Sequence, residues 1–224
     1  MKEQWCIAPQ ANAAFVCQME DVLEVYKLPY NAERPVICMD EMPKQLLMET
    51  REPLLCQAGT LAKQDYEYKR NGVADLFMVF EPLQGKRFVE VTEKRRKIEW
   101  ATVMKQVADE FYPQAEKIVV VLDNLNTHSA FYETFAPEEA RRLAERFEFH
   151  FTPKHGSWLN MAEIELSALV RQCLDRRLPN LKILTQEVQA WQQQRNDEVV
   201  KVLWQFKTSD ARIKLKHLYP KIQV

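Results

Sequence analysis

Residues 117–123 read KIVVVLD, and this run of apolar, mostly β-branched residues constrains the fold more than any other feature of the chain. β-Branched side chains favour extended backbone, and an apolar run without alternation is typical of a strand covered on both faces. The sequence therefore predicts a buried strand inside a sheet, with helices packed on each side. Because the run ends in Asp123, a carboxylate is expected at the carboxyl edge of that strand.

Four further segments have the composition of strands. Residues 34–41, RPVICMDE, are a short apolar run that ends in two acids, and residues 147–151, FEFHF, alternate as a one-sided strand does. Residues 73–83 and 86–91 are apolar or alternating, and Gln84-Gly85 between them is typical of a hairpin turn. Together with the run at 117–123, these segments predict a sheet of five strands.

Helices and one aperiodic stretch account for the remainder. Residues 44–72 show no clear period, so we expect a loop or a short excursion from the sheet there. This order of elements fits a mixed five-stranded α/β sheet with helices on both faces. Pro29 and Pro35 separate an N-terminal helical arm, residues 1–34, from a domain over residues 35–224 whose last part is basic and helical. Helices are predicted at residues 11–26, at residues 97–111, from Pro137 onward and from about Met161 to the end.

Composition excludes several classes of protein. The 224 residues are 46% hydrophobic, enough for a core, yet no apolar run approaches the roughly 18 residues of a membrane span. The N-terminus lacks a signal peptide, and the five cysteines are scattered without a Cys-x-x-Cys pair, so we expect a reduced, cytoplasmic protein with no membrane partner. With four glycines and no glycine-rich loop, a nucleotide-binding fold is disfavoured.

Charge is distributed unevenly along the chain. Residues 171–224 hold 11 Lys and Arg against 5 Asp and Glu, whereas the first 170 residues hold 20 against 27. A basic end on a mildly acidic body suits a protein that contacts nucleic acid with one region and binds cations with another. A solvated basic helix would produce the same imbalance, so charge alone leaves both interpretations open.

Three acids stand where a metal site would need them. Asp40 and Asp123 each end a predicted buried strand, next to the crevice where open α/β sheets bind ligands. Glu163 opens a predicted helix that could lean over that edge. Oxygen ligands with few His or Cys nearby favour Mg²⁺ or Mn²⁺ over zinc, and two such ions can cleave a phosphodiester. Strand-end aspartates that merely cap loops are common, and spacing alone does not decide between these readings.

The sequence segments around the three acids resemble those of a known family. CMDEMPKQL, VVLDNLNTHS and FTPKHGSWLNMAEIELSALVRQCLDRR look like the three signature blocks of DDE transposases of the mariner-type superfamily, in its bacterial insertion-sequence branch. The resemblance covers essentially the whole chain and implies an RNase H-like fold. It implies that Asp40, Asp123 and Glu163 hold two Mg²⁺ ions, with Mn²⁺ as a substitute. Matching positions Asn124, His128 and Asn160 are expected to support the site.

Two departures from the family pattern touch the last block. Thirty-nine residues separate Asp123 from Glu163, somewhat more than is common, and Met161 replaces the usual proline. Glu165 is therefore an alternative to Glu163, although the two cannot share a helix face because two residues turn a helix by about 200°. We favour Glu163. Glu41 should point to the opposite side of the sheet from Asp40, and we interpret it as structural.

The resemblance also implies partners. We expect double-stranded DNA, both element ends and target, and a homodimer because two ends must be synapsed. Lys154, His155 and Trp158 lie in a loop suited to phosphate contact and base stacking, although Trp158 could equally be buried beneath the helix. Backbone contacts are expected from the basic end, at Arg171, Arg176, Arg177, Arg212, Lys214 and Lys216.

The expected function is that of a transposase catalytic domain in the bacterial, nucleoid-associated cytoplasm. It would hydrolyse a phosphodiester at element ends, then join the freed 3′-hydroxyl to target DNA, of TA type by resemblance. Only about 35 residues precede the first catalytic strand, so we expect the N-terminal helix-turn-helix module to be absent or supplied in trans. The alternatives are an inactive or repurposed fragment that binds DNA or a partner, and a ribonuclease or repair nuclease of the same fold.

Overall fold

The computed structural model describes residues 10–54, 56, 58–59, 61, 63, 65–123 and 127–221. Five strands form one sheet in the order β3-β2-β1-β4-β5. β1 pairs antiparallel with β2, and β2 with β3, whereas β4 runs parallel to both β1 and β5. The prediction of a mixed five-stranded sheet is confirmed. The strands are β1 (Val36–Glu49), β2 (Tyr68–Glu81), β3 (Lys86–Thr92), β4 (Ile118–Leu122) and β5 (Phe147–Phe151).

β4 is the buried run that the sequence predicted, and all five of its residues are buried. Its side chains alternate between two hydrophobic clusters, with Val119 and Val121 in one. Ile118, Val120 and Leu122 lie in the other, which covers the opposite face of the sheet. An apolar run without alternation arises here because both faces of the central strand are packed.

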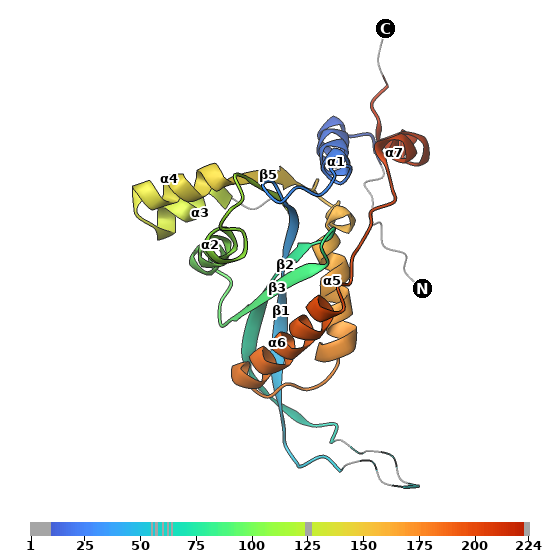
Figure 1. Cartoon of the computed structure of the whole chain (residues 1–224). Coiled ribbons are helices and arrows are strands. Elements are labelled where there is room, and N and C mark those ends of the chain that lie inside the picture. Colours follow the sequence, from blue (N-terminus) through green and yellow to red (C-terminus); the bar gives the residue numbers. More distant parts are fainter. Residues whose placement is uncertain are drawn as a thin grey trace.

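Helices cover both faces, as predicted (Figure 1). One face carries α2 (Lys97–Gln106), α3 (Thr127–Thr134) and α4 (Pro137–Arg146), and a π-helical turn, Val107–Phe111, extends α2. The other face carries α1 (Ala13–Val25), α5 (Met161–Leu169), α6 (Leu181–Asp197) and α7 (Thr208–Lys214). Short helical turns at Ser157–Leu159, Val170–Leu174 and Lys216–Leu218 complete the described elements. Within the described ranges, none of these helices is long and apolar enough to cross a membrane.

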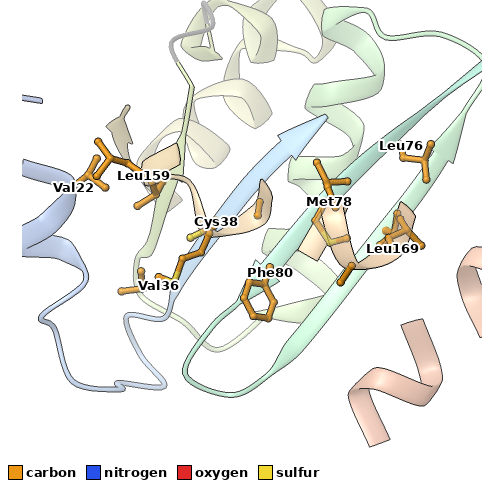
Figure 2. Close-up of a cluster of buried hydrophobic side chains, with 14 of the residues drawn as sticks. Val22, Val36, Cys38, Leu76, Met78, Phe80, Leu159 and Leu169 are labelled. Atoms are coloured by element: carbon orange, nitrogen blue, oxygen red, sulfur yellow. The ribbon is translucent and has the colours of Figure 1, made fainter. Parts of the chain in front are cut away.

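The cluster on the α5 face brings together distant parts of the chain (Figure 2). It contains Val22 of α1, Cys38 of β1, Met78 of β2 and Leu169 of α5, all buried. The buried side chains of α1 thus belong to the same core as those of the sheet. The helix predicted at residues 11–26 is confirmed as α1, while the proposed boundary between an arm at 1–34 and a domain at 35–224 stays a prediction.

The loop predicted over residues 44–72 is wrong at both of its ends. β1 continues to Glu49 and β2 begins at Tyr68, so the two strands form a long antiparallel hairpin that projects from the body (Figure 1). Residues 68–73 are all exposed, and a strand that is wet on both faces carries no apolar alternation for a sequence to display.

The helical prediction for the end of the chain is wrong over residues 200–207, which have no regular secondary structure. Val202, Trp204 and Phe206 are partly buried against the core, whereas the residues between them are exposed. This alternation marks an extended segment, and the pattern VxWxF was visible in the sequence.

Candidate active site at the carboxyl edge of β1 and β4

Asp40 and Asp123 belong to adjacent parallel segments. The register pairs Cys38 of β1 with Val121 of β4, and each aspartate stands two residues further along the chain, Asp40 inside β1 and Asp123 directly after β4. Because side chains alternate along a strand, Asp40 shares the face of Cys38, on which α5 packs. Pairing between β1 and β4 ends at this point, which opens the crevice typical of a binding site in such sheets.

The third acid reaches this crevice because α5 is attached to β1. Asn160 is buried, and its side-chain amide donates a hydrogen bond of 2.8 Å to the carbonyl of Met39, the residue before Asp40. Its side-chain oxygen accepts from the backbone N–H of Ala162 at 3.1 Å and so caps the helix. One side chain therefore fixes the start of α5, including Glu163 in its first turn, against the strand that carries Asp40.

The electrostatics of Asp40 link the three acids. Burial above all, together with the negative charges of Asp123 and Glu163, raises the pKa of Asp40 to about 6, against the opposing hydrogen bond from the Glu41 N–H and the charge of Arg95. The Glu41 N–H donates to Oδ1 of Asp40 at 2.8 Å. Both other acids therefore act on the charge of Asp40. Such crowding of carboxylates is relieved by a cation or by a shared proton.

Glu165 occupies a different environment from Glu163. It is 1% exposed, and its carboxylate bonds Arg87 at 3.1 Å and Arg195 at 2.8 Å. Glu163 is partly exposed and makes no ion pair with any described residue. The contacts therefore commit Glu165 to a buried ion-pair network with β3 and α6, and leave Glu163 outside that network, close enough to act on the charge of Asp40.

Glu41 lies on the opposite face of the sheet from Asp40, as its position in β1 predicts. Its nearest cation is Arg95, at 3.9 Å. Burial above all, together with the charge of Asp123, raises the pKa of Glu41 to about 7 against the opposing charge of Arg95. Glu41 therefore adds to the negative potential of this edge without sharing the face of Asp40.

The segment after β5 forms a second wall beside Asp123. A hollow of about 340 Å³ is lined by Asp123, Lys154, His155 and neighbouring residues. Lys154 and His155 are exposed, and His155 adopts a left-handed backbone conformation with φ of 65°. Trp158 is partly buried and packs edge-on against Phe206, with 6.0 Å between ring centroids. The loop thus presents a cation and an imidazole to the crevice, while its indole packs toward the core.

The six basic candidates of the C-terminal part are dispersed and differ in their surroundings. Arg212 forms two hydrogen bonds with Glu20 of α1, at 2.8 and 2.9 Å. Arg177 bonds Glu49 at 2.6 Å and so anchors the long hairpin. Arg176 pairs with Glu187, and Lys214 lies over the ring of Phe206. Arg171 and Lys216 are exposed and form no ion pair within the described part of the chain.

Two predicted supporting residues cannot be placed. Asn124 lies outside the described residues, and so does the side chain of His128, whose backbone begins α3. Sequence reasoning missed Tyr26, which follows α1: its hydroxyl donates a 2.6 Å hydrogen bond to the carbonyl of Leu159. No local signal could have indicated a contact that spans 133 positions.

The donor set suits a hard divalent cation, since it consists of carboxylate oxygens that repel one another. Among the described residues, no three His, Cys, Asp or Glu side chains are grouped so that they could hold one ion together. Both other acids act on the charge of Asp40, so an ion bound by Asp40 together with Asp123 or Glu163 would relieve their repulsion. The chemistry of the carboxylates present therefore fits hard divalent metal ions.

Comparison with known proteins identifies the class of protein that this fold and edge define. The profile of the DDE superfamily endonucleases matches residues 35–185, which span β1 to the start of α6. This chain belongs to the DDE superfamily endonuclease family. A search of curated proteins gave no match.

Solved structures show the same fold. The chain resembles the Mos1 mariner paired-end complex with Mn (TM-score 0.56, 15% identity, 89% of this chain and 61% of that one). It also resembles the Mos1 strand transfer complex, with a TM-score of 0.54, 13% identity, and coverage of 89% of this chain and 65% of that one. A third similar structure is the Mos1 paired-end complex with Mg, with a TM-score of 0.53, 12% identity, and coverage of 99% of this chain and 68% of that one. The chain thus spans about three fifths to two thirds of the Mos1 chains. The sheet and its helices match the RNase H-like catalytic fold of that transposase, and the predicted fold class is confirmed.

Proposed function

We propose that this chain is the catalytic domain of a DNA transposase of the bacterial insertion-sequence branch, and that it acts on double-stranded DNA in the nucleoid. The observation that carries the proposal is that Asn160 ties the helix of Glu163 to the strand of Asp40, next to the strand that precedes Asp123, inside the region that matches the endonuclease family. Mos1 structures of the same fold contain transposon-end DNA, Mn or Mg, which supports both DNA and a divalent cation as partners.

The proposed reaction is phosphodiester hydrolysis at an element end, followed by attack of the freed 3′-hydroxyl on target DNA. Asp40, Asp123 and Glu163 would hold two Mg²⁺ ions, with Mn²⁺ as a substitute. Those ions would activate the attacking oxygen and stabilise the leaving oxygen. Asn160 keeps Glu163 in register with Asp40 through its bond to the Met39 carbonyl.

DNA would enter along the wall formed by the loop after β5. Lys154 and His155 line the hollow beside Asp123 and are placed to contact a phosphate on one side of the scissile bond. Arg171 and Lys216 are exposed and are proposed as backbone contacts outside the crevice. Because two element ends must be joined, the proposal includes a homodimer.

The test is nicking of supercoiled and precut DNA in Mn²⁺ by the wild-type chain, by Asp123→Asn and by Asp75→Asn. Asp75 lies in β2 and pairs with Pro43, on the face of the sheet opposite Asp40, so it is the matched control. Loss of a metal-holding carboxylate should reduce nicking by more than about 100-fold. The Asp75 variant should retain activity. Equal nicking by the Asp123 variant would refute the site, and DNA binding without nicking by the wild type would favour an inactive DNA-binding fragment.

A further inference from the structure

Tyr26, in the N-terminal part of the chain, contacts the segments that carry the acids of the proposed active site. It follows α1 directly, and its ring packs against Trp204 of the extended segment, with 5.2 Å between centroids. Its hydroxyl lies 3.5 Å from Sγ of Cys38, which shares the face of Asp40 two residues earlier in β1. Tyr26 therefore stands between α1, β1 and the C-terminal segment, behind the carboxylates.

The hydroxyl of Tyr26 forms hydrogen bonds with the backbone on both sides of the N-cap of α5. It donates to the carbonyl of Leu159 at 2.6 Å, and it accepts from the backbone N–H of Met161 at 3.4 Å. The first N–H groups of a helix have no partner within the helix, so an external acceptor there orders the first turn. Leu159 is fully buried, so water cannot replace the phenol as a partner for its carbonyl.

One of these hydrogen bonds comes from Met161, the residue that replaces the proline usual in the resembled family. A proline at position 161 would have no N–H to donate, whereas Met161 has one and directs it to Tyr26. Asn160 binds the other side of the same turn through the carbonyl of Met39. The helix that carries Glu163 is thus held at its start by one bond to β1 and by two bonds to Tyr26.

We propose that Tyr26 is a positioning residue for Glu163, which holds the first turn of α5 at the distance from Asp40 that binding of a divalent cation requires. This inference rests on the proposed function. Tyr26 touches neither substrate nor metal, and acts through the backbone of residues 159–161. Removing its hydroxyl should loosen the first turn of α5 while leaving the fold and the two aspartates in place.

Tyr219 provides a matched control for Tyr26. Its hydroxyl donates a 2.7 Å hydrogen bond to Glu20, also on α1, yet this bond lies away from α5. Tyr26→Phe deletes the hydrogen bonds of its hydroxyl with Leu159 and Met161, whereas Tyr219→Phe deletes one hydrogen bond to α1. A merely structural role predicts a loss of thermal stability in each variant and no difference in metal affinity between the two.

The experiment measures Mn²⁺ binding by the full chain, from the electron paramagnetic resonance signal of the free ion, for wild type, Tyr26→Phe, Tyr219→Phe and Asp123→Asn. Loss of the two hydrogen bonds of the Tyr26 hydroxyl should weaken Mn²⁺ binding about 5- to 10-fold in Tyr26→Phe, because these bonds act one step behind a ligand. Tyr219→Phe should bind as the wild type does. Hydrogen exchange over residues 157–166 should accelerate at least about fivefold in Tyr26→Phe alone.

The possible outcomes separate the two proposals. If Asp123→Asn loses Mn²⁺ while Tyr26→Phe binds it as tightly as the wild type, the positioning role is overturned and the proposed function stands. Equal weakening in both tyrosine variants would show a general structural effect and would also overturn the role. If the wild type binds no Mn²⁺ under any condition, the proposed function fails first and the inference fails with it.

Discussion

Asp40 is the acid whose ionised form is disfavoured both by burial and by the charges of the other two acids. It is partly buried, and two further acids act on it, so its folded-state pKa of about 6 lies above the ordinary value for aspartate. A carboxylate in that environment destabilises the fold unless something neutralises it. The apolar run before it was sufficient to nominate it, although the expectation that it ends the strand was wrong, because β1 continues past it to Glu49. Its burial and its neighbours depend on how β4 and α5 are placed.

The raised pKa of Asp40 makes a prediction about pH. Below about pH 4 the group is protonated in both folded and unfolded chains, so its ionisation has no effect on stability. As pH rises through the window between about 4 and 6, only the unfolded chain ionises freely, and stability falls until the folded pKa of about 6 is passed. Asp40→Asn, which retains an acceptor for the Glu41 N–H, should therefore stabilise the metal-free protein at neutral pH.

Scanning calorimetry in EDTA measures this effect. After allowance for solvent screening, the variant should melt roughly 2–5 °C above the wild type at pH 7.5 and level with it at pH 4. Added Mn²⁺ should raise the melting temperature of the wild type more than that of the variant. An unchanged or lower melting temperature at pH 7.5 would contradict the charge repulsion assigned to Asp40.

α5 is the element that assembles the site, and its two acids have separate tasks. Glu163 lies in the first turn and acts on the charge of Asp40, whereas Glu165 is buried between Arg87 and Arg195. The helical period predicted that the two would face different ways, but only the structure shows which direction is the interior. The arginine partners lie 78 positions before Glu165 and 30 after it, beyond the reach of any local pattern.

Substituting each acid by glutamine should separate these tasks. Glu165→Gln leaves two buried guanidinium groups without their carboxylate and should cost about 3–5 kcal/mol of unfolding free energy, measured by urea denaturation. Glu163→Gln should leave the unfolding curve almost unchanged and abolish Mn²⁺-supported nicking. Nicking that survives in the Glu163 variant and disappears in a still-folded Glu165 variant would reverse the assignment.

Across the whole molecule, the sequence predicted the strands that are buried on one face or on both. It did not predict strand segments that are exposed on both faces. The KIVVVLD run predicted the central strand, and alternation predicted β3 and β5. The β2 half of the hairpin arm escaped prediction because residues 68–73 are all exposed. Of the candidate site, the two aspartates and Asn160 came from their motifs, whereas Tyr26 did not, since its role arises from a contact across 133 positions.

DNA affinity is a property of the whole surface, and its salt dependence counts phosphate contacts. Each arginine or lysine that contacts a phosphate contributes a slope of about 0.9 to the dependence of log affinity on log salt. Arg171→Ala should therefore lower the slope by about 1, whereas Arg212→Ala should change it less, because Glu20 already engages that guanidinium. Fluorescence anisotropy between 50 and 200 mM salt measures both slopes, and an equal decrease for the two variants would mean that the Arg212–Glu20 pair opens on DNA.

The central claim is that Asp40, Asp123 and Glu163 form a divalent metal site, and anomalous diffraction from crystals grown in Mn²⁺ tests it most directly. The account predicts manganese peaks within coordination distance, about 2.1–2.3 Å, of carboxylate oxygens of Asp40, with Asp123 or Glu163 as the second protein ligand of each ion. The manganese peak that has Asp123 as a ligand should vanish in crystals of Asp123→Asn. Manganese bound elsewhere in the molecule, with none at Asp40 at saturating concentration, would contradict the claim.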